Sequence, residues 1–131
     1  MKQSPQNLGK WGESLAAEYL LKRGYTIIAR NERTPYGELD LIVQQTAPAD
    51  SEPLEPQVVT VFVEVKTRTS KTFGYPEQSV TPRKREHLLS SAQYYLQEHP
   101  DQDIDWRIDV ISIERYGDQP PIIHHFENAL S

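Results

Sequence analysis

Two segments alternate between apolar and charged positions in the way that β-strands do. One runs from Gly37 to Gln44, and the other runs from Val58 to Thr67. Successive side chains of a strand point to opposite faces, so charges at every second position gather on one face. Asp40 is expected on one face of the first strand, and Glu64 and Lys66 on one face of the second. The opposite face of the first strand is expected to hold Leu39, Leu41 and Val43.

Two further segments have the three- and four-residue apolar spacing of amphipathic helices. The first predicted helix spans residues 8–23 and is followed by Gly24, which suits the left-handed residue after a helix. Glu13 lies at the edge of its apolar stripe, from where the side chain can reach inward. The second predicted helix spans residues 82–98, with Thr81 as its N-cap.

Further strands are predicted by β-branched and aromatic residues at 25–29, 106–114 and 122–126. The connecting segments are polar. Residues 1–7 are expected to be disordered, and residues 30–36 are expected to form a polar turn. Residues 46–57 contain three prolines and three acidic side chains, which predicts a flexible loop.

The order of these elements predicts an α/β protein with a mixed sheet. The first three strands are expected to pair as antiparallel hairpins. The helix between the third and fourth strands permits a parallel crossover. A chain of 131 residues suits one domain, so we expect residues 1–131 to form a single unit.

The charges of the two central strands predict a metal site if the strands are neighbours. Ionised groups inside a sheet are costly unless they are paired or bind a metal. Asp40 and Glu64 would then offer the hard oxygen ligands that Mg²⁺ or Mn²⁺ takes, with Lys66 beside them. This set suits metal-assisted hydrolysis of a phosphodiester. The alternative is an ion-pair network that only holds the sheet together.

Composition sets limits on location and partners. There are no cysteines, which removes disulfides and thiolate metal sites and fits a cytoplasmic protein. No signal peptide and no membrane-spanning run is recognised. The net charge of −5 argues against a nucleic-acid partner. However, the segment from Lys66 to Arg85 holds six basic residues and one acidic residue, so the region of the candidate site is basic.

The motifs of this chain resemble those of a nuclease superfamily. The pair of segments 37–42 (GELDLI) and 62–68 (FVEVKTR) is similar to the core of the PD-(D/E)XK nucleases. More narrowly, it resembles the YraN-like bacterial proteins, which are similar to archaeal Holliday junction resolvases. The proline of the superfamily name is replaced by Leu39. Further matching segments are Gly9-x-x-Gly12-Glu13, Arg30-Asn31, Phe73-Gly74, Lys84 and Arg107-Ile108-Asp109-Val110.

This resemblance implies a restriction-endonuclease-like three-layer fold, with a mixed central β-sheet flanked by α-helices. It implies Asp40, Glu64 and Glu13 as ligands of Mg²⁺ or Mn²⁺, and Lys66 as the catalytic lysine. The implied activity is hydrolysis of DNA, at branched or junction structures. A two-fold symmetric junction would require a homodimer. Among the basic residues near the site, those expected to contact DNA phosphates are Arg68, Lys71, Arg83 and Lys84.

Two other functions fit the same sequence. One is a nucleic-acid-binding module with little or no turnover, whereas the intact Glu64-x-Lys66 favours the enzyme. The other is a protein-interaction domain that uses the acidic loop. The adjacent His124 and His125 would point in opposite directions in a strand, which disfavours a metal site there. Asp109 is expected to be structural, pairing near Arg107 or with the first helix.

Overall fold

A five-stranded mixed sheet forms the centre of the protein. The computed structural model describes residues 5–47, 57–69, 80–102 and 105–130. The strands lie in the sheet in the order of the sequence, β1-β2-β3-β4-β5. Their bounds are Thr26–Thr34 (β1), Gly37–Ala47 (β2), Gln57–Arg68 (β3), Trp106–Glu114 (β4) and Ile122–Phe126 (β5). β3 and β4 are parallel and the other neighbours are antiparallel, which confirms the predicted mixed sheet.

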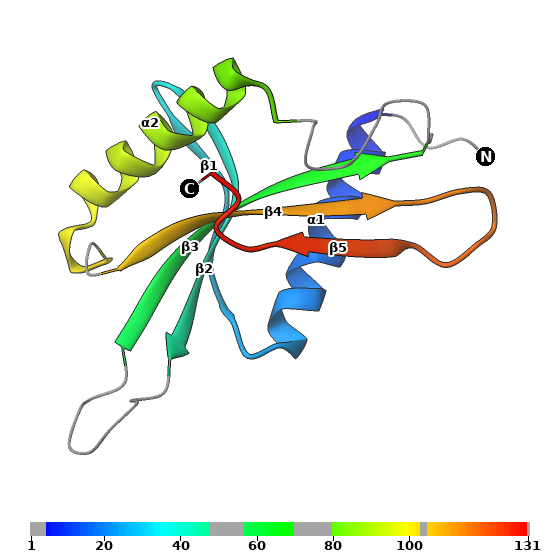
Figure 1. Cartoon of the computed structure of the whole chain (residues 1–131), viewed down its shortest axis with the longest axis horizontal. Helices are drawn as coiled ribbons and strands as arrows, with labels where there is room; N and C mark the ends of the chain where they lie inside the picture. Colours follow the sequence, from blue (N-terminus) through cyan, green and yellow to red (C-terminus); the bar gives the residue numbers. More distant parts are fainter. Residues whose placement is uncertain (1–4, 48–56, 70–79, 103–104, 131) are drawn as a thin grey trace.

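Two helices cover opposite faces of this sheet (Figure 1). α1 spans Pro5–Lys22 and precedes the sheet, whereas α2 spans Pro82–Glu98 and connects β3 to β4. A short 3₁₀ helix, Pro100–Gln102, follows α2. Thr81 caps α2 as predicted, because its hydroxyl accepts the backbone N–H of Lys84. Gly24 has a φ of 89°, the left-handed conformation predicted after α1.

The protein has two hydrophobic cores, one between each helix and the sheet, because successive side chains of the central strands point to opposite faces. On the α1 face, buried residues of the helix, of the sheet and of the turn between them form one cluster. Its members are Ala16, Ala17, Leu20, Tyr25, Leu41, Val43, Val61, Val63, Ile111 and Ile113. On the α2 face the buried set comprises Leu39, Ile42, Phe62, Leu88, Ala92, Tyr95, Leu96, Ile108 and Leu130. The aromatic residues Trp11, Tyr19 and Trp106 pack against these clusters and are partly buried.

Several element boundaries differ from the sequence-based expectation. α1 begins at Pro5, three residues before the predicted start, so residues 5–7 are helical; residues 1–4 lie outside the described residues. β1 continues to Thr34 through the segment that was expected to be a turn. The prediction of a turn was wrong because β1 is an edge strand, and an edge strand exposed to solvent can carry polar side chains. β2 extends to Ala47 and β3 begins at Gln57, and residues 48–56 of the expected loop lie outside the described residues.

The expected common face of Leu39, Leu41 and Val43 is wrong for Leu39. Leu41 and Val43 belong to the core under α1, but Leu39 belongs to the core under α2. The reason lies in the strand pairing. β2 pairs with β3 only from Leu41 to Ala47, whereas its pairing with β1 runs from Gln44 to Gly37. The start of β2 therefore leaves β3 and follows β1 toward α2, so strict alternation does not hold there.

α1 approaches β3 closely at one glycine. A Cβ atom built on Gly12 would overlap the hydroxyl of Thr67 and crowd the rest of that side chain. A Cβ atom built on Gly9, one turn earlier in the same helix, would meet no other atom. Gly12 therefore sets the distance between α1 and the end of β3, close to the charged residues described below.

Gly12→Ala is expected to lower the free energy of unfolding by about 1 to 2 kcal/mol, because overpacking costs more than the gain in helix propensity. Gly9→Ala is the matched control and is expected to raise it by about 0.5 to 1 kcal/mol. Urea denaturation followed by circular dichroism measures both. Equal effects of the two substitutions would contradict the close approach of α1 to Thr67.

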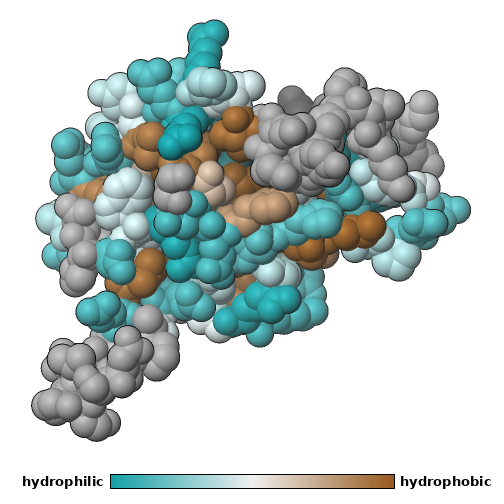
Figure 2. Space-filling view, viewed as in Figure 1, coloured by the Kyte–Doolittle hydropathy of each residue, from teal (hydrophilic) through white to brown (hydrophobic). Residues whose placement is uncertain are grey.

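The surface on the face drawn in Figure 2 is mostly hydrophilic, with hydrophobic areas separated by polar ones. The large hydrophobic side chains that are most exposed are Leu21, Tyr36 and Ile122. Among the described residues, no helix has the length and apolar character to cross a membrane.

Candidate active site

Asp40 and Glu64 meet where β2 leaves β3. At this point β2 no longer offers a backbone carbonyl to β3, and the Asp40 side chain takes its place. Asp40 Oδ2 accepts the backbone N–H of Val65 at 2.9 Å. The carboxyl groups of Asp40 and Glu64 line the same two clefts, and the charge of Glu64 acts on Asp40. The parting of the two strands thus exposes one carboxylate beside the other.

The environment raises the pKa of Asp40 to about 8. Burial is the largest cause, because it penalises the charged form. The negative charge of Glu64 is the next cause, and Glu13 adds to it, whereas the hydrogen bond from Val65 acts in the opposite direction. Two carboxyl groups this close resist full ionisation unless a cation joins them.

Two lysines neutralise Glu64, whose side chain is almost fully buried. Glu64 Oε1 lies 3.3 Å from the Nζ atom of Lys66 and 2.8 Å from that of Lys84. Lys66 reaches it from the same face of β3, two positions along the strand. Lys84 reaches it from the first turn of α2, where the N-cap Thr81 fixes the backbone. Both ammonium groups remain partly open to solvent and can therefore also meet a ligand.

Glu13 lies near Asp40 and Glu64 but belongs to α1, which covers the face of the sheet opposite to α2. Its Oε2 atom accepts a hydrogen bond from Asn31 Nδ2 at 3.3 Å. Asn31 lies in β1 with a φ of 53°, a left-handed conformation that is uncommon in a strand. Such conformations cost energy and are often found at functional sites. Burial raises the pKa of Glu13, and the charges of Glu38 and Glu64 raise it further.

Two clefts share these carboxylates. The larger has a volume of about 390 Å³ and is lined by Glu13, Lys66 and the N-terminal part of α1. The smaller, of about 240 Å³, extends along α2 on the other side. Asp40, Glu64 and Lys84 line both clefts. A bound molecule could therefore pass from one cleft to the other across the carboxylates.

The predicted site residues divide into three groups. Those that line the larger cleft are Glu13, Asp40, Glu64, Lys66 and Lys84. Arg68 is half-buried and Arg83 is exposed, and within the described ranges neither lines these two clefts. Lys71 and the Phe73-Gly74 pair lie outside the described residues. Of the three predicted phosphate contacts that the structure describes, Lys84 alone lies beside the carboxylates.

The side chains can offer a cation two adjacent carboxylates. In the part of the chain that the structure describes, no three His, Asp or Glu side chains are grouped closely enough to bind a metal by themselves. Mg²⁺ usually keeps several waters and takes one or two protein carboxylates together with substrate phosphate oxygens. Besides burial, the charges of Glu64 and Glu13 raise the pKa of Asp40, and a bound cation would offset these charges. The residues therefore fit a divalent cation that shares its coordination with water and substrate.

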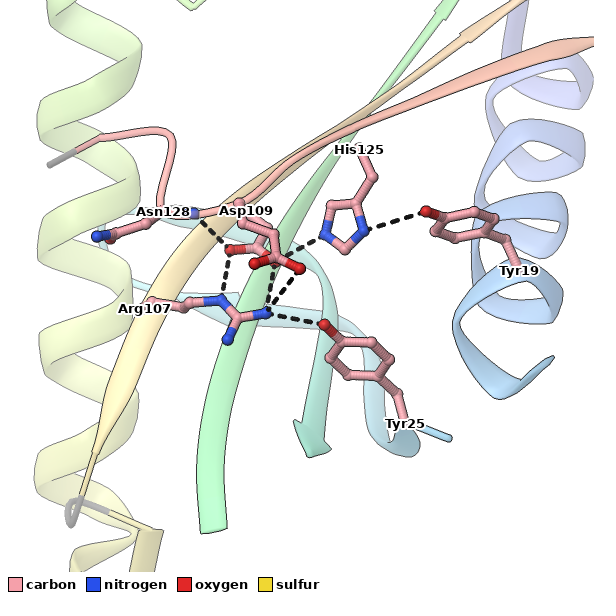
Figure 3. Close-up of polar contacts among 7 residues, drawn as sticks. Tyr19, Tyr25, Arg107, Asp109, His125 and Asn128 are labelled. Carbon is pink, nitrogen blue, oxygen red and sulfur yellow. Dashed lines mark hydrogen bonds and ion pairs between the residues drawn. The ribbon is translucent and has the colours of Figure 1, made fainter. Parts of the chain in front are cut away.

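A second polar cluster, separate from the clefts, surrounds Asp109. Its carboxylate is fully buried and accepts hydrogen bonds from Arg107 Nε at 3.0 Å and from the backbone N–H of Asn128 at 2.9 Å. His125 Nε2 lies 2.7 Å from the other carboxylate oxygen. Figure 3 shows His125 between Asp109 and Tyr19, whose hydroxyl lies 3.4 Å from Nδ1.

The sequence indicated Asp109 as a structural residue but did not indicate His125 as its partner. The only available signal was a carboxylate in the middle of an otherwise apolar strand. The pairing depends on the register of β5 against β4, in which Ile111 lies opposite His125. The cluster joins β4, β5 and the C-terminal turn and does not line the candidate active site.

The fold and the site define an α/β protein with a carboxylate–lysine cleft at the place where two central strands part. The chain belongs to the family described as "Uncharacterised protein family UPF0102", whose model matches residues 12–113. It is 45% identical over 124 residues to a UPF0102 protein of Syntrophomonas wolfei, covering 95% of this chain and 97% of the relative.

Two further relatives extend this similarity over nearly the whole chain. A UPF0102 protein of Dehalococcoides mccartyi is 41% identical over 130 residues, covering 99% of this chain and 98% of the relative. A UPF0102 protein of Syntrophotalea carbinolica is 39% identical over 123 residues, covering 94% and 90% respectively. These names state no activity, so the chemistry must be argued from the site.

Proposed function

We propose that this protein is a divalent-metal-dependent nuclease that hydrolyses phosphodiester bonds of DNA. The observation that carries the proposal is the meeting of two carboxyl groups, Asp40 and Glu64, with the ammonium group of Lys66 at 3.3 Å from Glu64. This set lies in an open cleft rather than in a closed ion-pair network. The resemblance of the two strand motifs to the PD-(D/E)XK nucleases and their restriction-endonuclease-like fold supports the same reading.

Asp40 and Glu64 would hold Mg²⁺ or Mn²⁺, and Glu13, which lines the same cleft, would contribute through water. When bound, the cation supplies positive charge at the scissile phosphate and lowers the pKa of a water. The backbone N–H of Val65 fixes the Asp40 carboxylate, so this ligand is oriented before substrate arrives.

Lys66 is the residue of the chain best placed to act on the reacting groups. Its ammonium has three N–H donors, of which one is directed at Glu64. The others can orient a water molecule or stabilise the negative charge that grows on the phosphate. Lys84 also neutralises Glu64, so Lys66 can leave this carboxylate without exposing a bare buried charge.

The test is cleavage of labelled DNA by the wild-type protein and by Asp40→Asn, Glu64→Gln and Lys66→Met. The substrates are a single strand, a flap and a four-way junction, each with Mg²⁺, Mn²⁺ or EDTA. We expect metal-dependent cleavage by the wild type and a loss of at least about 100-fold in each variant, the usual effect of removing one group that stabilises the transition state.

Matched controls come from Glu18 and Lys22, an exposed ion pair on α1. Substituting these residues removes the same kinds of charge at a place away from the cleft. Glu18→Gln and Lys22→Met should cleave as the wild type does. Calorimetric titration with Mn²⁺ should detect binding to the wild type that is lost in Asp40→Ala. Cleavage that survives all three active-site substitutions would refute the assignment. Binding of DNA without turnover under any metal would leave a binding module instead of a nuclease.

A further inference from the structure

The smaller cleft leads away from the carboxylates along one face of α2. Residues of this face recur at three- and four-residue spacing: Lys84, His87, Ser91 and Tyr94. The first three line the cleft that contains Asp40 and Glu64. Tyr94 lines the next hollow on the surface, of about 150 Å³, and Tyr36 lines both. The two hollows therefore adjoin at Tyr36, and together they form a groove that leads from the candidate active site to two tyrosines.

The far end of this groove is built from the tip of the β1–β2 hairpin and from α2. Tyr36 is 53% exposed, and its ring lies 6.4 Å from that of Tyr94, with 67° between the ring planes. The hairpin is pinned to the helix: Thr34 Oγ1 lies 2.9 Å from Ser91 Oγ and accepts the backbone N–H of Tyr36 at 3.1 Å. The two rings are thus held in place before any ligand binds.

Among the described residues, the lining of the far end is uncharged. Besides the two tyrosines it contains Ser90, Gln93 and Gln97. Hydroxyl and amide groups can contact a phosphate, but these residues offer no ammonium or guanidinium group to neutralise one. Aromatic rings and amide side chains instead suit the faces and edges of nucleobases, which are accessible only when a strand is unpaired.

We infer that this groove binds an unpaired DNA strand, with bases stacked on Tyr36 and Tyr94 while the backbone crosses the carboxylates. The inference rests on the proposed nuclease function and specifies its substrate class: a strand that is single-stranded on the α2 side of the scissile phosphate. α2 rises about 1.5 Å per residue, so Lys84 and Tyr94 lie about 15 Å apart along the helix axis. That distance spans roughly four nucleotides at the duplex spacing of a strand, and fewer in an extended strand.

The closing experiment measures binding separately from cleavage. Fluorescence anisotropy in EDTA compares a labelled oligothymidylate of about 12 nucleotides with a blunt duplex of the same length. We expect the single strand to bind more tightly to the wild type. Tyr36→Leu and Tyr94→Leu should each weaken single-strand binding by about 5- to 100-fold, the usual loss of one stacked base, with little change for the duplex.

Tyr36→Phe and Tyr94→Phe are the conservative controls, because they keep the ring and should keep the affinity. Ile122→Ala removes an exposed apolar side chain on β5 and should leave binding unchanged. Thermal unfolding of each variant checks that the fold is intact.

The outcomes separate this inference from the proposed function. Tyrosine variants that bind the single strand as the wild type does would overturn the groove assignment, even if metal-dependent cleavage is found. Equal affinity for single strand and duplex would overturn it as well. Conversely, loss of single-strand binding in the leucine variants without any cleavage by the wild type would support the groove and refute the nuclease.

Discussion

Replacing Asp109 with alanine is expected to lower the free energy of unfolding by about 3 to 5 kcal/mol, the usual cost of breaking a buried ion pair from one side. The substitution removes the acceptor for two nitrogens of Arg107, for His125 and for the backbone N–H of Asn128. It leaves the guanidinium of Arg107 with only partial compensation, from the hydroxyl of Tyr25 and from Glu127 at 3.8 Å. Urea denaturation at pH 7 measures the loss.

The pH dependence gives this prediction a second test. Burial alone would raise the pKa of Asp109, but hydrogen bonds from His125, Arg107 and Asn128 outweigh it and lower the pKa. A carboxyl whose pKa falls on folding stabilises the folded state above its unfolded pKa of about 4. That contribution is lost as the pH falls through the lower folded value. The advantage of the wild type over Asp109→Ala should thus be full at pH 7 and shrink below about pH 4.

Asp105→Ala provides the matched control for Asp109→Ala. Asp105 is exposed just before the same strand, and β3 uses only its backbone carbonyl, which the substitution preserves. Its replacement should change the free energy of unfolding by less than about 0.5 kcal/mol. A loss below about 0.5 kcal/mol for Asp109→Ala, as for a surface substitution, would show that the cluster does not hold β4, β5 and the C-terminal turn together.

The two clusters differ in how far the sequence could predict them. Asp40, Glu64 and Lys66 lie on two strands that each alternate clearly, and one hairpin connects these strands. The two-residue period of each strand was therefore enough to predict that these three side chains share one face of the sheet. Asp109 and His125 also lie on neighbouring strands, but β5 is short and weakly patterned. Its register against β4 depends on contacts that only the folded chain reveals.

The same reasoning explains the errors in the fold. Leu39 breaks the alternation because β2 loses its partner β3 at Asp40, an event that no local pattern records. The polar half of β1 was expected to be a turn because an edge strand need not carry an apolar face. The sequence predicts a phosphate contact for Lys84. It could not predict the ion pair with Glu64, because that pair depends on how α2 packs on the sheet. The departures thus cluster around the candidate active site, where function competes with regular structure.

Asp40→Asn is expected to stabilise the metal-free protein at pH 9 by about 2 to 5 kcal/mol, as expected for a carboxyl whose pKa is raised to about 8 on folding. Between about pH 4 and pH 8 the folded state keeps a proton that the unfolded state has released. The stability of the wild type therefore falls as the pH rises through this window and is constant above it. Asparagine does not titrate, and its side-chain oxygen can still accept the N–H of Val65.

Urea denaturation from pH 5 to pH 9.5 in EDTA should show the two proteins diverging as the pH rises, with the variant more stable. Asp101→Asn, an exposed carboxyl after α2, is the control and should follow the wild type throughout. Parallel curves for wild type and Asp40→Asn would contradict the crowding of charge at the strand junction. Replacing EDTA with Mn²⁺ should narrow the difference, because a cation at 100 times its Kd stabilises the folded wild type by about 2.7 kcal/mol and lacks a ligand in the variant. Such a narrowing would identify Asp40 as a residue whose charge costs stability in the free protein and is required for the cation.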